Sequence, residues 1–105
     1  MSRRLTKCKL IRDGLTPLGP VTCAPAPSRA IHAALLILKL HEEVGEVAED
    51  LTDTREYADV LQALMDLAQL SGVPWEEVET ELIWKAKHRG GFEGGKVMVV
   101  KGRTA

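Results

Sequence analysis

The 105-residue sequence has few cysteines, few aromatic residues and no large excess of charge of either sign. Its two cysteines, Cys8 and Cys23, fit neither a C-x-x-C motif nor a zinc-ligand spacing, which indicates free thiols in a reducing compartment. The net charge of -1 argues against a nucleic-acid-binding protein, because phosphate contacts need a basic excess. No apolar run approaches the roughly 20 residues of a membrane span, and the N-terminus lacks the apolar segment of a signal peptide. We therefore expect a cytoplasmic protein without membrane or nucleic-acid partners.

Three segments of the chain have a helical pattern. Residues 1–27 carry four of the five prolines and form an irregular lead-in. Ser28 is suited to cap a helix that runs to about Leu51, and a second helix follows over about residues 55–70. Pro74 then opens a third helix, which ends before Gly90 and Gly91. The helical core is therefore expected over residues 28–89 of a single domain, 1–105.

The expected fold class is all-α. Two long antiparallel helices and one shorter helix form a bundle, with short extended arms at both ends of the chain, and the tail over residues 90–105 is extended. Three helices leave a bundle incomplete, so we expect oligomerisation to complete it, as a homodimer or homotetramer. Apolar positions of the first helix recur at three- and four-residue steps and form one stripe: Ala33, Ile37, Leu40, Val44, Ala48 and Leu51. The first half of this helix is apolar on nearly all sides, as expected for a helix that is buried on several sides.

The stretch HEEVGEVAED carries five acids in ten positions between two apolar runs. Its spacing is E-E-x-x-E, at Glu42, Glu43 and Glu46, and the second helix begins with E-x-x-D, at Glu56 and Asp59. Acids one turn apart project side by side, and a short break between antiparallel helices brings the two sets together. Their repulsion is relieved either by protonation or by bound cations. Oxygen ligands without histidine or thiolate favour Mg²⁺, with Mn²⁺ as the alternative.

An acid-rich helix is most often simply a solvated face, so this alternative stays open beside the metal pocket. Two features favour the pocket. The second helix carries a thin polar stripe on an otherwise apolar surface, at Asp59, Gln62, Asp66 and Gln69. Lysines that would form ordinary surface pairs with the acids are nearly absent between residues 42 and 66.

The succession of E-E-x-x-E and E-x-x-D on consecutive helices resembles the signature of the all-α nucleoside triphosphate pyrophosphohydrolases, the MazG-like superfamily. KLIRD, residues 9–13, is similar to the opening of its small phosphoribosyl-ATP pyrophosphohydrolase-like members. EYADVLQALMDLAQLSGVPWEEVE resembles their second helix and its exit, and KAKHRGGFEGGKVMV, residues 85–99, resembles their closing segment. The stretch GLTPLGPVTCAPAP, residues 14–27, departs from the pattern of these relatives.

The resemblance implies cleavage between the α and β phosphates of a nucleoside triphosphate, giving the monophosphate and pyrophosphate, in nucleotide-pool house-cleaning. It implies Glu43, Glu46, Glu56 and Asp59 as magnesium ligands. Glu42 would be a further ligand or, with Glu43, a catalytic residue that orients water. Two alternatives remain: phosphoribosyl-ATP pyrophosphohydrolase activity in histidine biosynthesis, and a non-catalytic helical interaction module.

A triphosphate substrate needs cationic contacts besides the metal. The candidate phosphate contacts are Lys39, Lys85, Arg89 and Arg12. Lys39 lies one turn before Glu43 and could pair with that acid instead. Cations in the last turn of the third helix also complement the helix dipole. Trp84 is a candidate for stacking on the substrate base or for a subunit contact.

Overall fold

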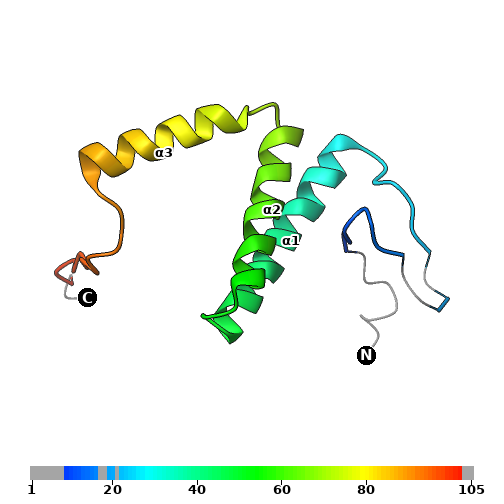
Figure 1. Ribbon diagram of the computed structural model, residues 1–105, viewed down its shortest axis with the longest axis horizontal. Coiled ribbons are helices and arrows are strands. Elements are labelled where there is room, and N and C mark those ends of the chain that lie inside the picture. The colour runs from blue at the N-terminus through cyan, green and yellow to red at the C-terminus, as the bar shows by residue number, and fades with distance from the viewer. Residues whose placement is uncertain (1–8, 17–18, 21, 103–105) are drawn as a thin grey trace. The chain divides into compact units, whose positions relative to one another are not determined.

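The computed structural model describes residues 9–16, 19–20 and 22–102, and this part of the chain contains three helices and no strand. The helices are α1 (Arg29–Glu49), α2 (Thr54–Leu70) and α3 (Trp75–Arg89) (Figure 1). The expected all-α class is therefore confirmed, and none of these helices is long and apolar enough to cross a membrane. The chain divides into two units, residues 1–75 and 76–105.

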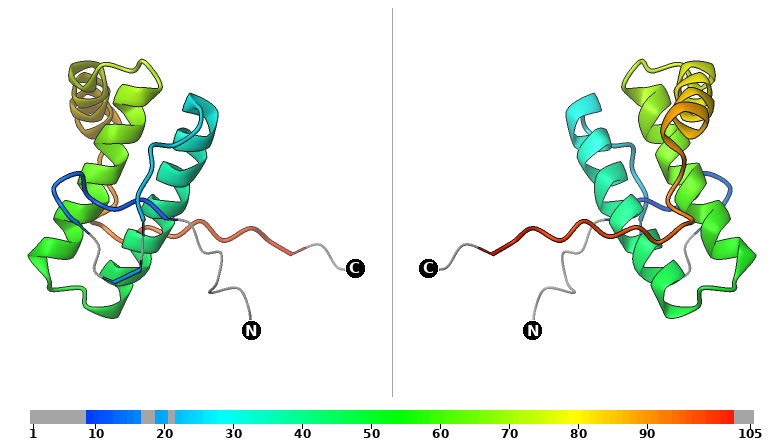
Figure 2. Two further views of the ribbon diagram at one scale, coloured as in Figure 1. Left: turned by 90° about the vertical axis from the view of Figure 1, so that its right-hand side faces the viewer. Right: turned by 90° about the vertical axis from the view of Figure 1, so that its left-hand side faces the viewer.

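Helices α1 and α2 lie side by side and form a hairpin, as the two views in Figure 2 show. Helix α1 begins where expected, because the Oγ of Ser28 accepts a hydrogen bond from the backbone N–H of Ile31 at 3.1 Å. This bond satisfies one of the N–H groups that lack a partner in the first turn of any helix. The sequence therefore located the start of α1 correctly.

The turn between α1 and α2 begins at Asp50, and α1 ends at Glu49, two residues before the expected end. The Oδ1 atom of Asp50 accepts hydrogen bonds from the backbone N–H and the hydroxyl of Thr52, at 3.1 and 2.8 Å. Such a local bond competes with helix continuation. Asp53 then caps α2, because its Oδ1 accepts from the backbone N–H of Arg55 at 3.0 Å.

Helix α2 ends in a turn that requires glycine. Gly72 has φ +77°, a left-handed conformation that side chains with a Cβ rarely adopt. Its N–H donates to the carbonyl of Gln69, and the N–H of Val73 donates to the carbonyl of Ala68 at 2.9 Å. These two bonds form a Schellman motif, which satisfies carbonyl groups at the end of the helix.

The hairpin is packed through a narrow core. Leu36 of α1 and Ala63 of α2 are the buried apolar residues in the described part of the chain, at 5% and 6% exposure. The side chain of α1 that shares this burial is Glu43, at 9%. The expected burial of α1 on several sides is therefore wrong: within its apolar stripe, Ile37, Val44 and Leu51 have 45%, 51% and 66% of their surface exposed. Because α1 is apolar on nearly all sides, its hydrophobic periodicity did not determine which face turns inward.

The described part of the N-terminal arm, residues 9–16, contains a turn rather than a strand. The N–H of Leu15 donates to the carbonyl of Arg12 at 3.0 Å, and the chain reverses there. Residues 1–8 of the predicted arm, including Cys8, lie outside the described residues. Cys23 has a free, exposed thiol, as expected.

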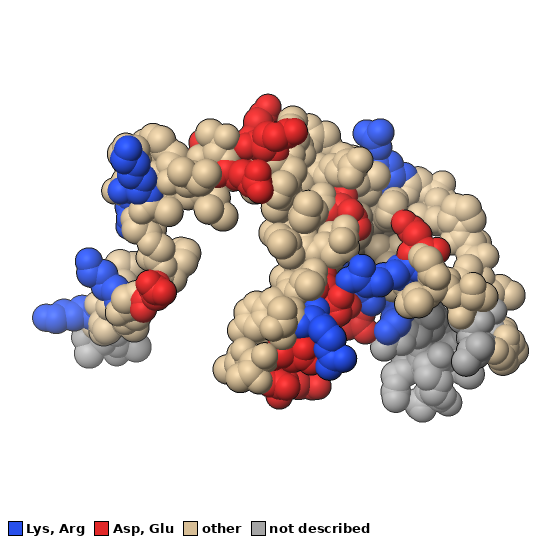
Figure 3. Space-filling view, in the orientation of Figure 1, with Lys and Arg blue, Asp and Glu red and all other residues tan. Residues whose placement is uncertain are grey.

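The second unit consists of α3 and the tail. None of the residues of α3 is buried in the structure. Its acidic side chains gather over its beginning and its basic side chains over its end, as Figure 3 shows. The tail has no strand among its described residues, and Val97, Met98, Val99 and Val100 are 76–86% exposed.

We expect the Ser28→Ala variant to lower the free energy of unfolding by about 1 kcal/mol, because the first turn of α1 loses its capping acceptor. Urea denaturation followed by circular dichroism measures the change. Ser71→Ala is a matched control, since Ser71 caps the end of α2 through its backbone N–H, which alanine retains. Equal stability of the Ser28→Ala variant and the unchanged protein would contradict the assigned role of this cap.

Candidate functional site

A cavity of about 850 Å³ lies between the arm and the hairpin. Residues 10–15 of the arm line one side, and the inward faces of α1 and α2 line the others. The polar stripe predicted for α2 faces this cavity, since its four members are all lining residues. The polar stripe of α2 therefore lines a cavity, as its pattern indicated. The lining residues that α2 contributes are Asp59, Gln62, Ala63, Asp66, Gln69 and Leu70.

Three carboxylates converge beside the cavity. One oxygen each from Glu43, Glu56 and Asp59 lies within 4.8 Å of the others. Glu43 comes from α1, whereas Glu56 and Asp59 lie one turn apart at the beginning of α2. The group forms because a short turn joins the helices, so the last turns of α1 oppose the first turns of α2. Three oxygen donors in this arrangement are of the kind that Mg²⁺ and Mn²⁺ prefer.

The two other acids of the predicted site lie outside this group of three. Glu46 is exposed on α1, yet its charge still acts on Glu56. Glu42 accepts hydrogen bonds from two lysines, at 3.0 Å from the Nζ of Lys9 and at 3.1 Å from the Nζ of Lys39. Of the four predicted metal ligands, the structure thus brings Glu43, Glu56 and Asp59 together.

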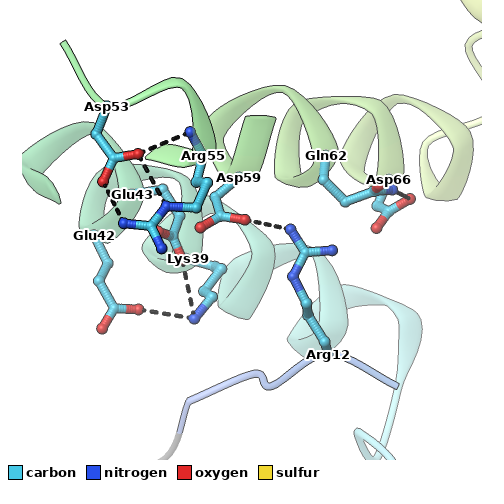
Figure 4. A network of polar contacts seen from close by, with 9 residues as sticks. All are labelled: Arg12, Lys39, Glu42, Glu43, Asp53, Arg55, Asp59, Gln62 and Asp66. Atoms are coloured by element: carbon cyan, nitrogen blue, oxygen red, sulfur yellow. Dashed lines mark hydrogen bonds and ion pairs between the residues drawn. The ribbon is translucent and has the colours of Figure 1, made fainter. Parts of the chain in front are cut away.

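Basic side chains neutralise part of this acidic group (Figure 4). Lys39 contacts both Glu42 and Glu43, and its Nζ lies 3.3 Å from an oxygen of Glu43. Arg12, on the arm, donates to the Oδ1 of Asp59. Lys9 and Arg12 therefore attach the arm to α1 and α2 respectively. The contact predicted between Lys39 and Glu43 is present. Arg12, predicted as a phosphate contact, lies at the site and contacts Asp59.

The charges shift the pKa values of several of these groups. Partial burial raises the pKa of Glu56, and the neighbouring carboxylates, Glu46 foremost, add to the effect. The pKa of Glu42 is lowered by its hydrogen bonds to Lys9 and Lys39, which outweigh its burial. Burial alone would lower the pKa of Lys39, but its bonds to two acids raise it. Negative charge is thus disfavoured at Glu56 and favoured at Glu42.

The remaining predicted substrate contacts belong to the second unit. The ring of Trp84 stacks on the ring of His88, with centroids 4.2 Å apart and an angle of 18° between the planes. The guanidinium of Arg89 lies 5.6 Å from the centroid of the Trp84 ring. Lys85 is exposed, and no ion pair of Lys85 or Arg89 occurs among the described residues.

Sequence reasoning missed several residues of the cavity wall. Arg29, His32 and Leu36 line the cavity, together with Lys39, which the sequence had indicated. These residues and Glu43 recur at three- and four-residue steps, so all of them lie on one face of α1. The position of Glu43 on α1 could have identified this face, whereas the apolar stripe of α1 indicates a different face. The contact of Lys9 with an acid of α1 had no signal of this kind, because the two residues lie far apart in the chain.

Comparisons of the chain with models of protein families, with curated proteins and with solved structures found no match. The resemblance to the MazG-like superfamily thus rests on the sequence motifs alone. What the geometry adds is the convergence of acids from the two motifs that carry this resemblance.

We expect the Glu56→Gln variant to be more stable than the unchanged protein at neutral pH. The raised pKa means that the folded protein disfavours the charged form, so ionised Glu56 destabilises the fold above that pKa. Below the ordinary pKa of glutamate the side chain is protonated in both states, and the difference disappears. Urea midpoints measured from neutral to acidic pH without divalent ions test this.

Glu93→Gln is the control for the loss of one charge, because Glu93 is exposed in the tail. A stability gain for Glu56→Gln that persists unchanged at acidic pH would show that the ionisation of Glu56 is not its cause.

Proposed function

We propose that the protein is a magnesium-dependent nucleoside triphosphate pyrophosphohydrolase of the MazG-like superfamily, from its small phosphoribosyl-ATP pyrophosphohydrolase-like branch. It would cleave between the α and β phosphates and release the nucleoside monophosphate and pyrophosphate, as a cytoplasmic house-cleaning enzyme. The single observation that carries this proposal is the convergence of Glu43, Glu56 and Asp59 beside a cavity that the polar stripe of α2 lines.

The residues present are compatible with a divalent ion. Three carboxylates supply hard oxygen donors, and their mutual repulsion gives the protein a physical reason to take up a cation. Glu43, Glu56 and Asp59 would hold the ion, and Glu46 is the fourth ligand that the resemblance implies. When bound, Mg²⁺ lowers the pKa of a coordinated water and neutralises charge on the phosphates.

The other residues of the cavity have roles that follow from their contacts. Lys39 is held at the acids by Glu42 and Glu43, so its ammonium is positioned at the edge where phosphate oxygens would lie. The lowered pKa of Glu42 keeps this carboxylate ionised, which suits it to accept a hydrogen bond from water and orient it. Gln62 donates to Asp66 at 3.1 Å, and this pair supplies polar groups deeper along α2.

Arg12 connects the arm to the proposed chemistry. Its guanidinium contacts Asp59, one of the three proposed ligands, and in this position it acts as a cation in the acidic group. A divalent ion would compete with Arg12 for the same carboxylate. The displaced guanidinium, still on the wall of the cavity, would then be available to the phosphates of a substrate.

We also propose that the helical bundle is completed by further subunits, as a homodimer or homotetramer. The hairpin leaves large apolar side chains exposed on both helices, and contact with another subunit would cover them. The exposed apolar residues of the hairpin include Ile37, Leu38, Val44, Tyr57, Leu61 and Leu64.

The activity is tested by measuring pyrophosphate release from a panel of canonical and modified nucleoside triphosphates and from phosphoribosyl-ATP, with Mg²⁺ and with chelator. We expect Mg²⁺-dependent release from nucleoside triphosphates. We expect Asp59→Asn to lower kcat/KM by about 100-fold or more, the scale on which a single charge-stabilising group acts. Glu49→Gln, an exposed acid of α1 away from the cavity lining, is the matched control.

Release from phosphoribosyl-ATP alone would assign the protein to histidine biosynthesis. No release from any substrate would favour the interaction module and overturn the proposal. Circular dichroism of each variant separates a loss of activity from a loss of fold.

Arg12→Gln should bind Mn²⁺ about two- to fivefold more tightly than the unchanged protein, because the metal no longer displaces a cation from Asp59. Electron paramagnetic resonance of free Mn²⁺ measures the affinity. Arg29→Gln is the control, since Arg29 also lines the cavity but forms no ion pair among the described residues. An unchanged affinity in Arg12→Gln would show that Arg12 does not occupy the metal site.

A further inference from the structure

Helix α3 contains no buried residue, and apolar side chains in its middle are exposed. Leu82 and Ile83, in the middle of the helix, are 65% and 64% exposed. At about 100° per residue, Trp75, Val78 and Leu82 lie along one face. An apolar stripe with no buried residue is typical of a helix whose contact partner is another molecule.

The charges of α3 are divided between its two halves. Its acids all precede Leu82, and its basic residues all follow it. The acids are Glu76, Glu77, Glu79 and Glu81, and the basic residues are Lys85, Lys87, His88 and Arg89. The helix dipole explains the charges of the terminal turns only, because its effect decays within the first and last turn. Glu81 and Lys85 lie outside those turns, and both flank the apolar face on the same side.

We propose that α3 pairs with α3 of a second copy of this chain, antiparallel, about a two-fold axis at Leu82. In this arrangement, residues at equal distances before and after Leu82 lie at the same level of the pair. Val78 of each copy then lies opposite Ala86 of the other across the apolar face. Trp75 lies opposite Arg89, a pair suited to a cation–π contact.

The flanks of the contact also bring unlike charges together. Because the two-fold axis keeps each flank of one helix beside the same flank of the other, Glu81 of each copy lies on the same flank as Lys85 of the other. The two residues are offset by about 3 Å along the helix axis, which long side chains can bridge. Within one copy these two side chains form no ion pair among the described residues, so both are available to a second molecule. Charged residues beside an apolar seam select the partner in coiled coils in the same way.

The charge pattern selects this partner and this direction. A parallel pair would place the acidic half of one helix beside the acidic half of the other, and the basic half beside the basic half. The antiparallel pair places each acidic half beside a basic half. An isologous contact requires a surface that is complementary to itself, and the sequence of α3 has this property about its central residue.

The pairing also gives Lys85 and Arg89 a role that needs neither metal nor substrate. It is therefore independent of the proposed enzymatic function, and each can fail without the other.

The first test is the association of the full chain by sedimentation over a concentration series. We expect Glu81→Lys alone, and Lys85→Glu alone, to weaken dimerisation by about fivefold or more, because each creates two like-charge pairs per dimer. The double variant should restore the affinity of the unchanged chain, since a base at position 81 would again lie beside an acid at position 85. The double variant has the composition of the original chain and is its own matched control.

A second test uses a Cys8→Ser, Cys23→Ser background, which removes the native thiols. In this background, Leu82→Cys should form a symmetric interchain disulfide under mild oxidation, because position 82 lies on the axis. Thr80→Cys, on the opposite side of the helix, should not. Circular dichroism confirms the fold of each variant.

A chain that stays monomeric at every concentration would overturn the proposal. So would a dimer that is indifferent to both single charge changes, or single changes that weaken it without rescue in the double variant. Absence of the Leu82→Cys disulfide in a dimeric protein would likewise show that the copies associate through another face, such as the apolar surface of the hairpin.

Discussion

Repulsion between carboxylates held by two packed helices is the constraint that organises the first unit of this protein. Leu36 and Ala63 bring α1 and α2 together, and the same packing holds Glu43, Glu56 and Asp59 close to one another. Acids placed so near to one another need cations, and the chain supplies some of them itself. Lys39 serves this purpose from within α1, and Arg12 from the arm. Through Lys9 and Arg12, the arm contacts the hairpin by ion pairs to its acids.

Much of the fold could be predicted because local chemistry determines it. The oxygen of Ser28, the side chain of Asp53 and the glycine at position 72 fix helix ends through bonds with residues nearby in sequence. The convergence of Glu43 with Glu56 and Asp59 was predictable for a related reason. Acids at helical spacing on either side of a short turn lie near one another, although the spacing did not distinguish Glu43 from the exposed Glu46.

The errors arose where the deciding interactions lie far apart in sequence or where a helix has no clear polar side. The first half of α1 is apolar on nearly all sides, so its own sequence does not indicate the inward face. That face depends on the contacts of α1 with α2 and with the arm. That face carries Lys39 and Glu43, while Ile37 and Val44 remain exposed. The pairing of Arg12 with Asp59 joins residues 47 positions apart, and no periodicity within either segment indicates it.

The tail has a consequence for how the chain behaves in solution. Val97 to Val100 is a short run with strong β propensity, and it is well exposed along its length. Such a run can add to the same run in another molecule through its free backbone groups and begin aggregation. Lys96 and Lys101 bracket the run, and their charges act as gatekeepers, because stacking identical tails in register would bring like charges together. High salt, which screens this repulsion, should therefore make the chain less soluble.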